Sequence, residues 1–142
     1  MKTLLLTALL LSSFVHADIE VSNERIRAVA PGQKMTGAFM EIKNTGNDLQ
    51  LVSATSSVSK AVELHTHIKD GDVMRMRKVN AIDLPSNSTT ELKPGGLHIM
   101  FIGLNTHLEV DQTVGVTLNF SDDRQVELNI PVKAIMPMGH KK

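Results

Sequence analysis

The segment VELHTHIKDGDVMRMRKV, residues 62–79, determines how the middle of this chain folds. Apolar and polar side chains alternate on both sides of KDGD, residues 69–72, as they do in strands with one buried face. An Asp-Gly pair between two such runs is a strong signal for a β-hairpin. We therefore expect two antiparallel strands joined by a tight turn at Asp70-Gly71.

This hairpin has unusual polar residues at matching positions. Alternate residues of a strand share a face, so His65 and His67 should lie together on the first strand, and Met74 and Met76 on the second. Partners on neighbouring antiparallel strands are roughly 5 Å apart. A pair of imidazoles and a pair of thioethers are therefore predicted to meet on one surface.

A second segment, LHIMFIGL at residues 97–104, repeats the combination. It is apolar enough to be a buried strand, in which Ile99 and Phe101 should face the core. His98 and Met100, two residues apart, should then share the opposite face. Three strands would thus supply one cluster of His and Met side chains.

The rest of the chain indicates an all-β protein. No segment after the leader has a convincing helical period, and short strands follow one another at close spacing between turn signals such as NTGND and SDDR. This pattern predicts an antiparallel β-sandwich or barrel. The further expected strands are residues 19–29, 36–44, 49–56, 113–120 and 125–135, with a short extended piece between LPSNS and LKPGG.

The first 17 residues, MKTLLLTALLLSSFVHA, have the charged start, apolar run and small-residue ending of a secretory signal peptide. We expect this leader to be removed, so that no membrane span remains. One domain of residues 18–133 should follow, with a flexible tail over 134–142. The protein is expected to be exported.

Composition excludes several functions. The chain has no cysteine, which rules out thiol catalysis, a redox dithiol and a standard blue-copper site, since that site needs a thiolate. Charges are balanced at 15 basic and 15 acidic residues, and Trp and Tyr are absent, so nucleic acid is a poor candidate partner. We find no pattern of catalytic residues with useful spacing and expect no enzyme.

Thioether and imidazole ligands together favour one metal. A thioether is soft and uncharged and selects Cu(I) over Mg, Ca or Mn, while imidazole serves either oxidation state of copper. A single Met in a strand is usually core filler, and a single His is usually structural or exposed. The grouping on consistent strand faces is what favours a metal site.

The spacing of these residues, H-x10-M-x21-H-x-M, resembles the signature of the periplasmic copper chaperones called PCu(A)C. The segments GAFMEIKNTG, VELHTHIKDGDVMRMRKV and LKPGGLHIMFIGL also look like segments of that family, in the same order. The resemblance covers roughly residues 20–133, and it implies a cupredoxin-like β-sandwich with one Cu(I) at an exposed site.

Transferred to this chain, the resemblance implies that His65, Met76, His98 and Met100 are the Cu(I) ligands. It also implies a periplasmic carrier that delivers copper to an acceptor such as the CuA subunit of a respiratory oxidase (cytochrome c oxidase assembly) or a Sco-type protein. We expect the protein to be a monomer.

Auxiliary candidates lie outside the four-residue motif. His67 and Met74 share the faces of the motif residues and could support the metal or its transfer. The tail contributes Met136, Met138 and His140, which the resemblance associates with a second, weaker Cu(II) site; a frayed end that binds nothing tightly is an equal alternative.

Three other functions stay open from the sequence. The first is a copper enzyme, which would need a substrate pocket and a further base. The second is a periplasmic copper storage or resistance protein. The third is an exported adhesion or assembly sandwich without metal, in which the spacing would be a coincidence.

Overall fold

The computed structural model describes residues 18–134. This part of the chain folds into ten strands and no helix, and therefore contains no helix that could cross a membrane. The strands are β1 (Ile19–Arg27), β2 (Met35–Asn44), β3 (Leu49–Thr55), β4 (Ser59–Asp70), β5 (Val73–Val79), β6 (Ile82–Leu84), β7 (Ser88–Leu92), β8 (His98–Leu104), β9 (Thr113–Phe120) and β10 (Gln125–Lys133).

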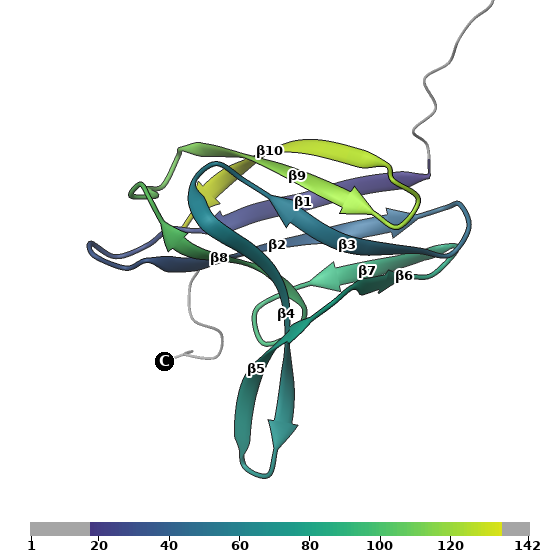
Figure 1. The fold of residues 1–142 in the computed structure, drawn as a ribbon, viewed down its shortest axis with the longest axis horizontal. Coiled ribbons are helices and arrows are strands. Elements are labelled where there is room, and N and C mark those ends of the chain that lie inside the picture. Colours follow the sequence, from purple (N-terminus) through teal and green to yellow (C-terminus); the bar gives the residue numbers. More distant parts are fainter. Residues whose placement is uncertain (1–17, 135–142) are drawn as a thin grey trace, which may run out of the picture.

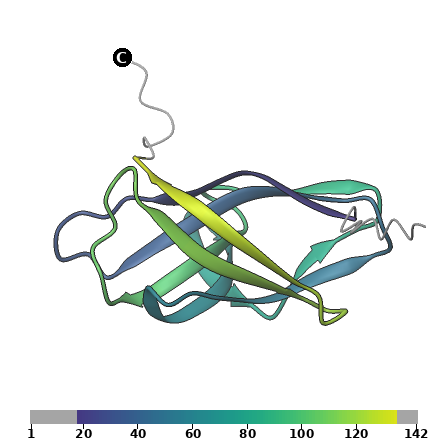
Figure 2. The ribbon, with the colours of Figure 1, turned by 90° about the horizontal axis from the view of Figure 1, so that it is seen from above.

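The strands form two layers that share one continuous hydrogen-bonded path. One layer has the order β5-β4-β8-β2-β1, with β7 beside the far half of β2, and the other has the order β10-β9-β3-β6. Figure 2, a view from above, shows β9 (green) and β10 (yellow) side by side across the face nearest the viewer. The predicted β-sandwich is confirmed.

A parallel strand pair joins the two layers, whereas the sequence predicted antiparallel pairing only. β1 and β10 run parallel, with Ile26 opposite Val132 and Arg27 opposite Lys133. Parallel partners need a long connection, and here nearly the whole chain lies between them, so no local turn signal could reveal the pairing. The three-residue strand β6 was also missed, since so short a strand shows no period.

The space between the layers is filled by apolar side chains. Ile99 and Phe101 of β8 are fully buried there, together with residues of β2 such as Met40 and Ile42. The alternation predicted for LHIMFIGL is therefore confirmed: Ile99 and Phe101 face the core. His98 and Met100 occupy the alternate positions of the same strand, so their side chains are directed to the outer face of the first layer.

The hairpin β4–β5 projects from the body of the sandwich (Figure 1). Its predicted turn lies one residue too early: the observed two-residue loop is Gly71-Asp72, with Asp70 opposite Val73. Gly71 occupies the first loop position at a φ of +62°, where a glycine adopts the required conformation without steric cost. The turn position has a direct consequence for the metal-ligand candidates on the two strands.

Candidate metal site

Strand register brings His and Met side chains from three adjacent strands to one face. A loop at Asp70-Gly71 would have placed His65 opposite Met76. The observed loop instead places His67 opposite Met76 and His65 opposite Lys78. Moving the turn by one residue changes every cross-strand partner by two positions, so all of these residues keep the predicted face.

The next strand inward completes the group. β8 lies beside β4, with His98 opposite His65 and Met100 opposite Glu63. On its other side β8 pairs with β2, where Gly37 is opposite Met100. The outer face of the four adjacent strands β5, β4, β8 and β2 therefore contains three imidazoles and at least two thioethers at neighbouring positions of the sheet.

These side chains surround a pocket of about 350 Å³, which is lined by His67, Met76, His98 and Met100 among others. His98 and Met100 form a buried part of this lining, with exposed fractions of 3% and 8%, whereas Met76 on the projecting hairpin is 44% exposed. The site implied by the resemblance is thus exposed on one side only.

Hydrogen bonds determine which ring nitrogens are free on two of the imidazoles. The Nδ1 of His98 lies 2.9 Å from the carbonyl oxygen of Gly96, and the Nδ1 of His67 lies 3.3 Å from the same oxygen. A carbonyl oxygen only accepts, so each Nδ1 must donate a proton to it. In the neutral rings, the Nε2 atoms of His67 and His98 therefore keep free lone pairs.

His65 has the opposite arrangement. Its Nε2 lies 2.7 Å from Oε2 of Glu63, and an ionised carboxylate only accepts, so Nε2 carries the proton. Its Nδ1 is buried and makes no hydrogen bond. A buried nitrogen without a partner is costly, and a metal ion is one partner that would satisfy it. The pair matches the carboxylate–imidazole arrangement that orients metal-binding His.

Electrostatics keep the site ready for a cation. Burial lowers the pKa of His98 from its ordinary value, and this effect outweighs the hydrogen bond to the Gly96 carbonyl oxygen, which raises it. The hydrogen bond from His65 lowers the pKa of Glu63, and the Lys78 ammonium, 3.7 Å away, adds to that effect. At neutral pH, His98 is therefore unprotonated and Glu63 is ionised.

The donor set fits a soft metal. Ring centroids of His67 and His98 are 5.2 Å apart, and those of His65 and His98 are 5.8 Å apart. Two imidazoles on one metal, with metal–nitrogen bonds of about 2.0–2.1 Å, place their centroids roughly 5–6 Å apart. Within residues 18–134, no three His, Asp or Glu side chains could hold a metal without help. Thioethers would have to complete the coordination, which favours Cu(I).

The structure groups the predicted residues unequally. His67, Met76, His98 and Met100 line the pocket, while His65 lies just outside that lining, next to the His98 ring. Met74 is opposite Lys69, one step further from the body, and is not part of the pocket. Met136, Met138 and His140 lie outside the described residues.

The sequence pattern did not identify one methionine of the pocket. Met35, at the start of β2, is 43% exposed and lines the same pocket. No His or Met stands two residues away from it, which is the signal that identified the other candidates. Only the pairing of β2 with β8 brings it near Met100.

Comparison with known proteins places this fold in a family. The family described as "Putative lipoprotein LpqE-like" matches residues 19–132. The chain is 39% identical over 117 residues to the "Putative lipoprotein Lxx21020" of Leifsonia xyli subsp. xyli, covering 81% of this chain and 69% of that protein. It is 32% identical over 95 residues to the uncharacterized protein RP573 of Rickettsia prowazekii, covering 66% of this chain and 52% of that protein.

Solved structures with the same architecture include PCuAC domains. The copper-bound PCuAC domain from PmoF2 superposes with a TM-score of 0.71 at 22% identity, over 83% of this chain and 94% of that domain. The Cu(I)-bound form of DR1885 from Deinococcus radiodurans gives a TM-score of 0.66 at 28% identity, over 83% of this chain and 81% of that one. The chain therefore belongs to the LpqE-like lipoprotein family, with the fold of PCuAC domains.

Proposed function

We propose that this protein is an exported copper carrier that binds one Cu(I) and passes it to an acceptor protein. One observation carries the proposal: imidazoles and thioethers from β4, β5 and β8 line a single pocket, and the unpartnered Nδ1 of His65 belongs to a ring beside it. The similarity to DR1885, which was solved with Cu(I), supports it.

The proposed ligands are His65, Met76, His98 and Met100. His65 would bind through Nδ1 and His98 through Nε2, because hydrogen bonds occupy the other nitrogen of each ring. All four ligands are neutral, so the charge of the ion stays uncompensated, which favours Cu(I) over Cu(II). His67, directly opposite Met76, is well placed to replace His65 during loading or release.

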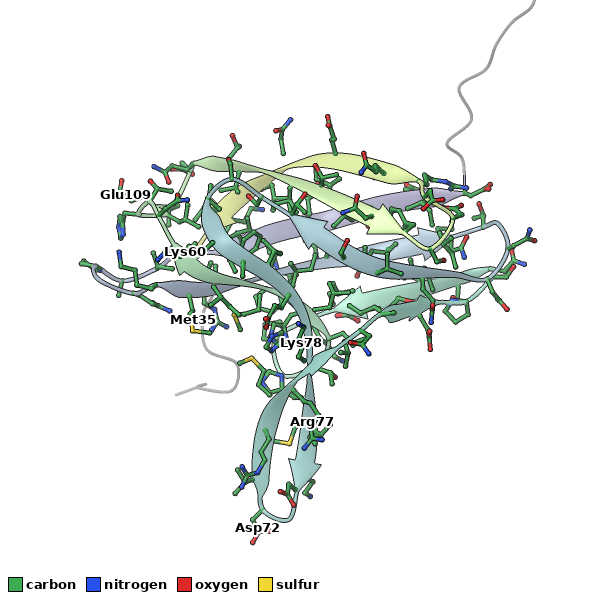
Figure 3. The ribbon with its side chains drawn as sticks, viewed as in Figure 1. Met35, Lys60, Asp72, Arg77, Lys78 and Glu109 are labelled. Atoms are coloured by element: carbon green, nitrogen blue, oxygen red, sulfur yellow. The ribbon has the colours of Figure 1, made fainter. Side chains whose placement is uncertain are left out.

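The site suits a carrier because its ligands differ in exposure. His98 and Met100 lie on a buried strand of the sandwich, whereas Met76 lies on the projecting hairpin. In Figure 3 the hairpin extends from Lys78, at its base, to Asp72, at its tip. An acceptor could therefore replace an exposed ligand such as Met76 before the buried ligands release the ion, which is how ligand exchange proceeds.

The cellular setting is part of the proposal and is supported by the leader-like start of the chain and by the family. We propose a periplasmic location, export by residues 1–17, and delivery to the CuA subunit of a respiratory oxidase or to a Sco-type protein. The lipoprotein descriptions of the family and of the Leifsonia relative support a role outside the cytoplasm. Neutral ligands also suit an oxidising compartment, where a thiolate site would be exposed to disulfide formation.

A competition titration tests the proposal. The purified chain without its leader is titrated with Cu(I) against a chromogenic Cu(I) chelator, beside Met76→Leu and a variant ending at Ile135. We expect one tight equivalent that Met76→Leu weakens and the truncation leaves unchanged. A chain that takes no Cu(I) from the chelator would overturn the proposal. Loss of a second, weaker equivalent on truncation would assign that equivalent to Met136, Met138 and His140.

A further inference from the structure

We propose that Met35 is a third thioether of this site, one that holds Cu(I) while the ion enters or leaves. This inference rests on the proposed function and adds a residue that the motif spacing does not contain. Met35 lies on β2, next to the buried half of the pocket and across it from the hairpin that carries Met76. Figure 3 shows it on the side of the body from which the hairpin extends.

The register of β2 against β8 places Met35 within reach of the ion. Gly37 is directly opposite Met100, so Met35, two residues earlier, is its diagonal neighbour on the same face. Diagonal partners are about 7–8 Å apart at their Cα atoms, a distance that long side chains span. Gly37 adds no side chain between the two thioethers, and the ring of Phe39, which also lines the pocket, reaches to 3.2 Å from where a Cβ of Gly37 would lie.

The segment before Met35 is held in place. Gln33 accepts a hydrogen bond from the Ala30 amide at 3.1 Å and donates one to the Met35 carbonyl oxygen at 3.0 Å. The hydroxyl of Thr36 donates to the carbonyl oxygen of Arg27 at 2.6 Å. The backbone at Met35 is therefore held by hydrogen bonds on both sides, while its side chain is 43% exposed at the pocket.

An exposed, movable thioether at a pocket rim has a clear use in copper transfer. When an acceptor displaces Met76 or an imidazole, the ion loses a ligand, and a nearby neutral sulfur can replace it without a proton being gained or lost. Such a ligand lowers the barrier in both directions and leaves the equilibrium affinity nearly unchanged. Exposed hydrophobic residues scattered on a surface are common, so the proposal depends on position and not on exposure.

Transfer kinetics test the role of Met35. The Cu(I)-loaded chain is mixed with excess chromogenic chelator in a stopped-flow instrument, and the rate of transfer is compared with that of Met35→Leu. Val110→Leu is the control, because Val110 is an exposed apolar residue outside the pocket, and its transfer rate should equal that of wild type. We expect transfer from Met35→Leu to be about tenfold slower, equivalent to about 1.4 kcal/mol of barrier, at an affinity within about twofold of wild type.

A double variant gives a second readout. With Met76 replaced by Leu, Met35 should become a resident ligand, so adding Met35→Leu should weaken Cu(I) binding much more than Met35→Leu does alone. Unchanged transfer kinetics together with additive affinities would overturn the inference and leave the carrier proposal intact. A wild-type chain that binds no Cu(I) would overturn both.

Discussion

Replacing Glu63 with Gln should weaken Cu(I) binding without removing any ligand. Glu63 accepts the Nε2 proton of His65 at 2.7 Å, which leaves Nδ1 as the nitrogen that can bind metal. Gln can still accept this proton but has no charge, so the ring keeps its orientation and becomes a weaker base. Loss of such outer partners costs about 10–100-fold in metal affinity. We expect about tenfold for Glu63→Gln and nearer a hundredfold for Glu63→Ala, which loses the bond as well.

Competition with a chromogenic Cu(I) chelator measures these affinities. Glu127→Gln, the same change on exposed β10 in the other layer, should have no effect. Lys78→Gln should change affinity by less than about twofold, because the exposed Lys78–Glu63 pair contributes little. If Glu63→Gln and Glu63→Ala both matched wild type, His65 would not bind the ion through Nδ1, and the proposed ligand set would be wrong.

Three further changes test other parts of the account. Met100→Leu conserves side-chain volume, so thermal unfolding should show that the free energy of unfolding falls by less than about 1.5 kcal/mol. Chelator competition should show Cu(I) affinity falling more than about 100-fold, because losing a ligand costs more than losing a residue that only orients one. The copper-free protein should lose stability as pH falls below the ordinary His pKa of 6.5. Burial lowers the pKa of His98 in the folded protein, so the unfolded chain binds more protons below that pH. Urea unfolding at pH values on both sides of 6.5 should show a smaller pH dependence in His98→Gln than in wild type. Phe101→Ala, at a fully buried position, should cost about 3–5 kcal/mol in urea unfolding, and a loss under 1 kcal/mol would contradict the assigned core.

The fold and most of the site follow from period-two patterning. Alternation in LHIMFIGL separates Ile99 and Phe101 from His98 and Met100, and the structure confirms that separation. Alternation also assigns the correct face to every His and Met of the hairpin, because an error of one residue in the turn shifts cross-strand partners by two and conserves the face.

Which residues lie opposite one another on neighbouring strands depends on information that local sequence patterns lack. The choice between His65 and His67 opposite Met76 depends on which residue of KDGD begins the loop, and the positive φ of Gly71 decides it. Met35 reaches the pocket only through the pairing of β2 with β8, strands separated by more than 50 residues of chain. Neither contact has a signature within a few residues of sequence.

The central claim is that Cu(I) is held by two imidazole nitrogens and two thioether sulfurs, and copper X-ray absorption tests it most directly. The chain loaded with one equivalent of Cu(I) should give an edge typical of Cu(I) and a first shell that requires both nitrogen and sulfur scatterers. Because Met35 is proposed to replace Met76, the double variant Met76→Leu/Met35→Leu is the informative one: it should reduce the sulfur contribution by about half while nitrogen is retained, given one sulfur lost of two. A first shell fitted by nitrogen or oxygen alone, unchanged in the double variant, would contradict the account.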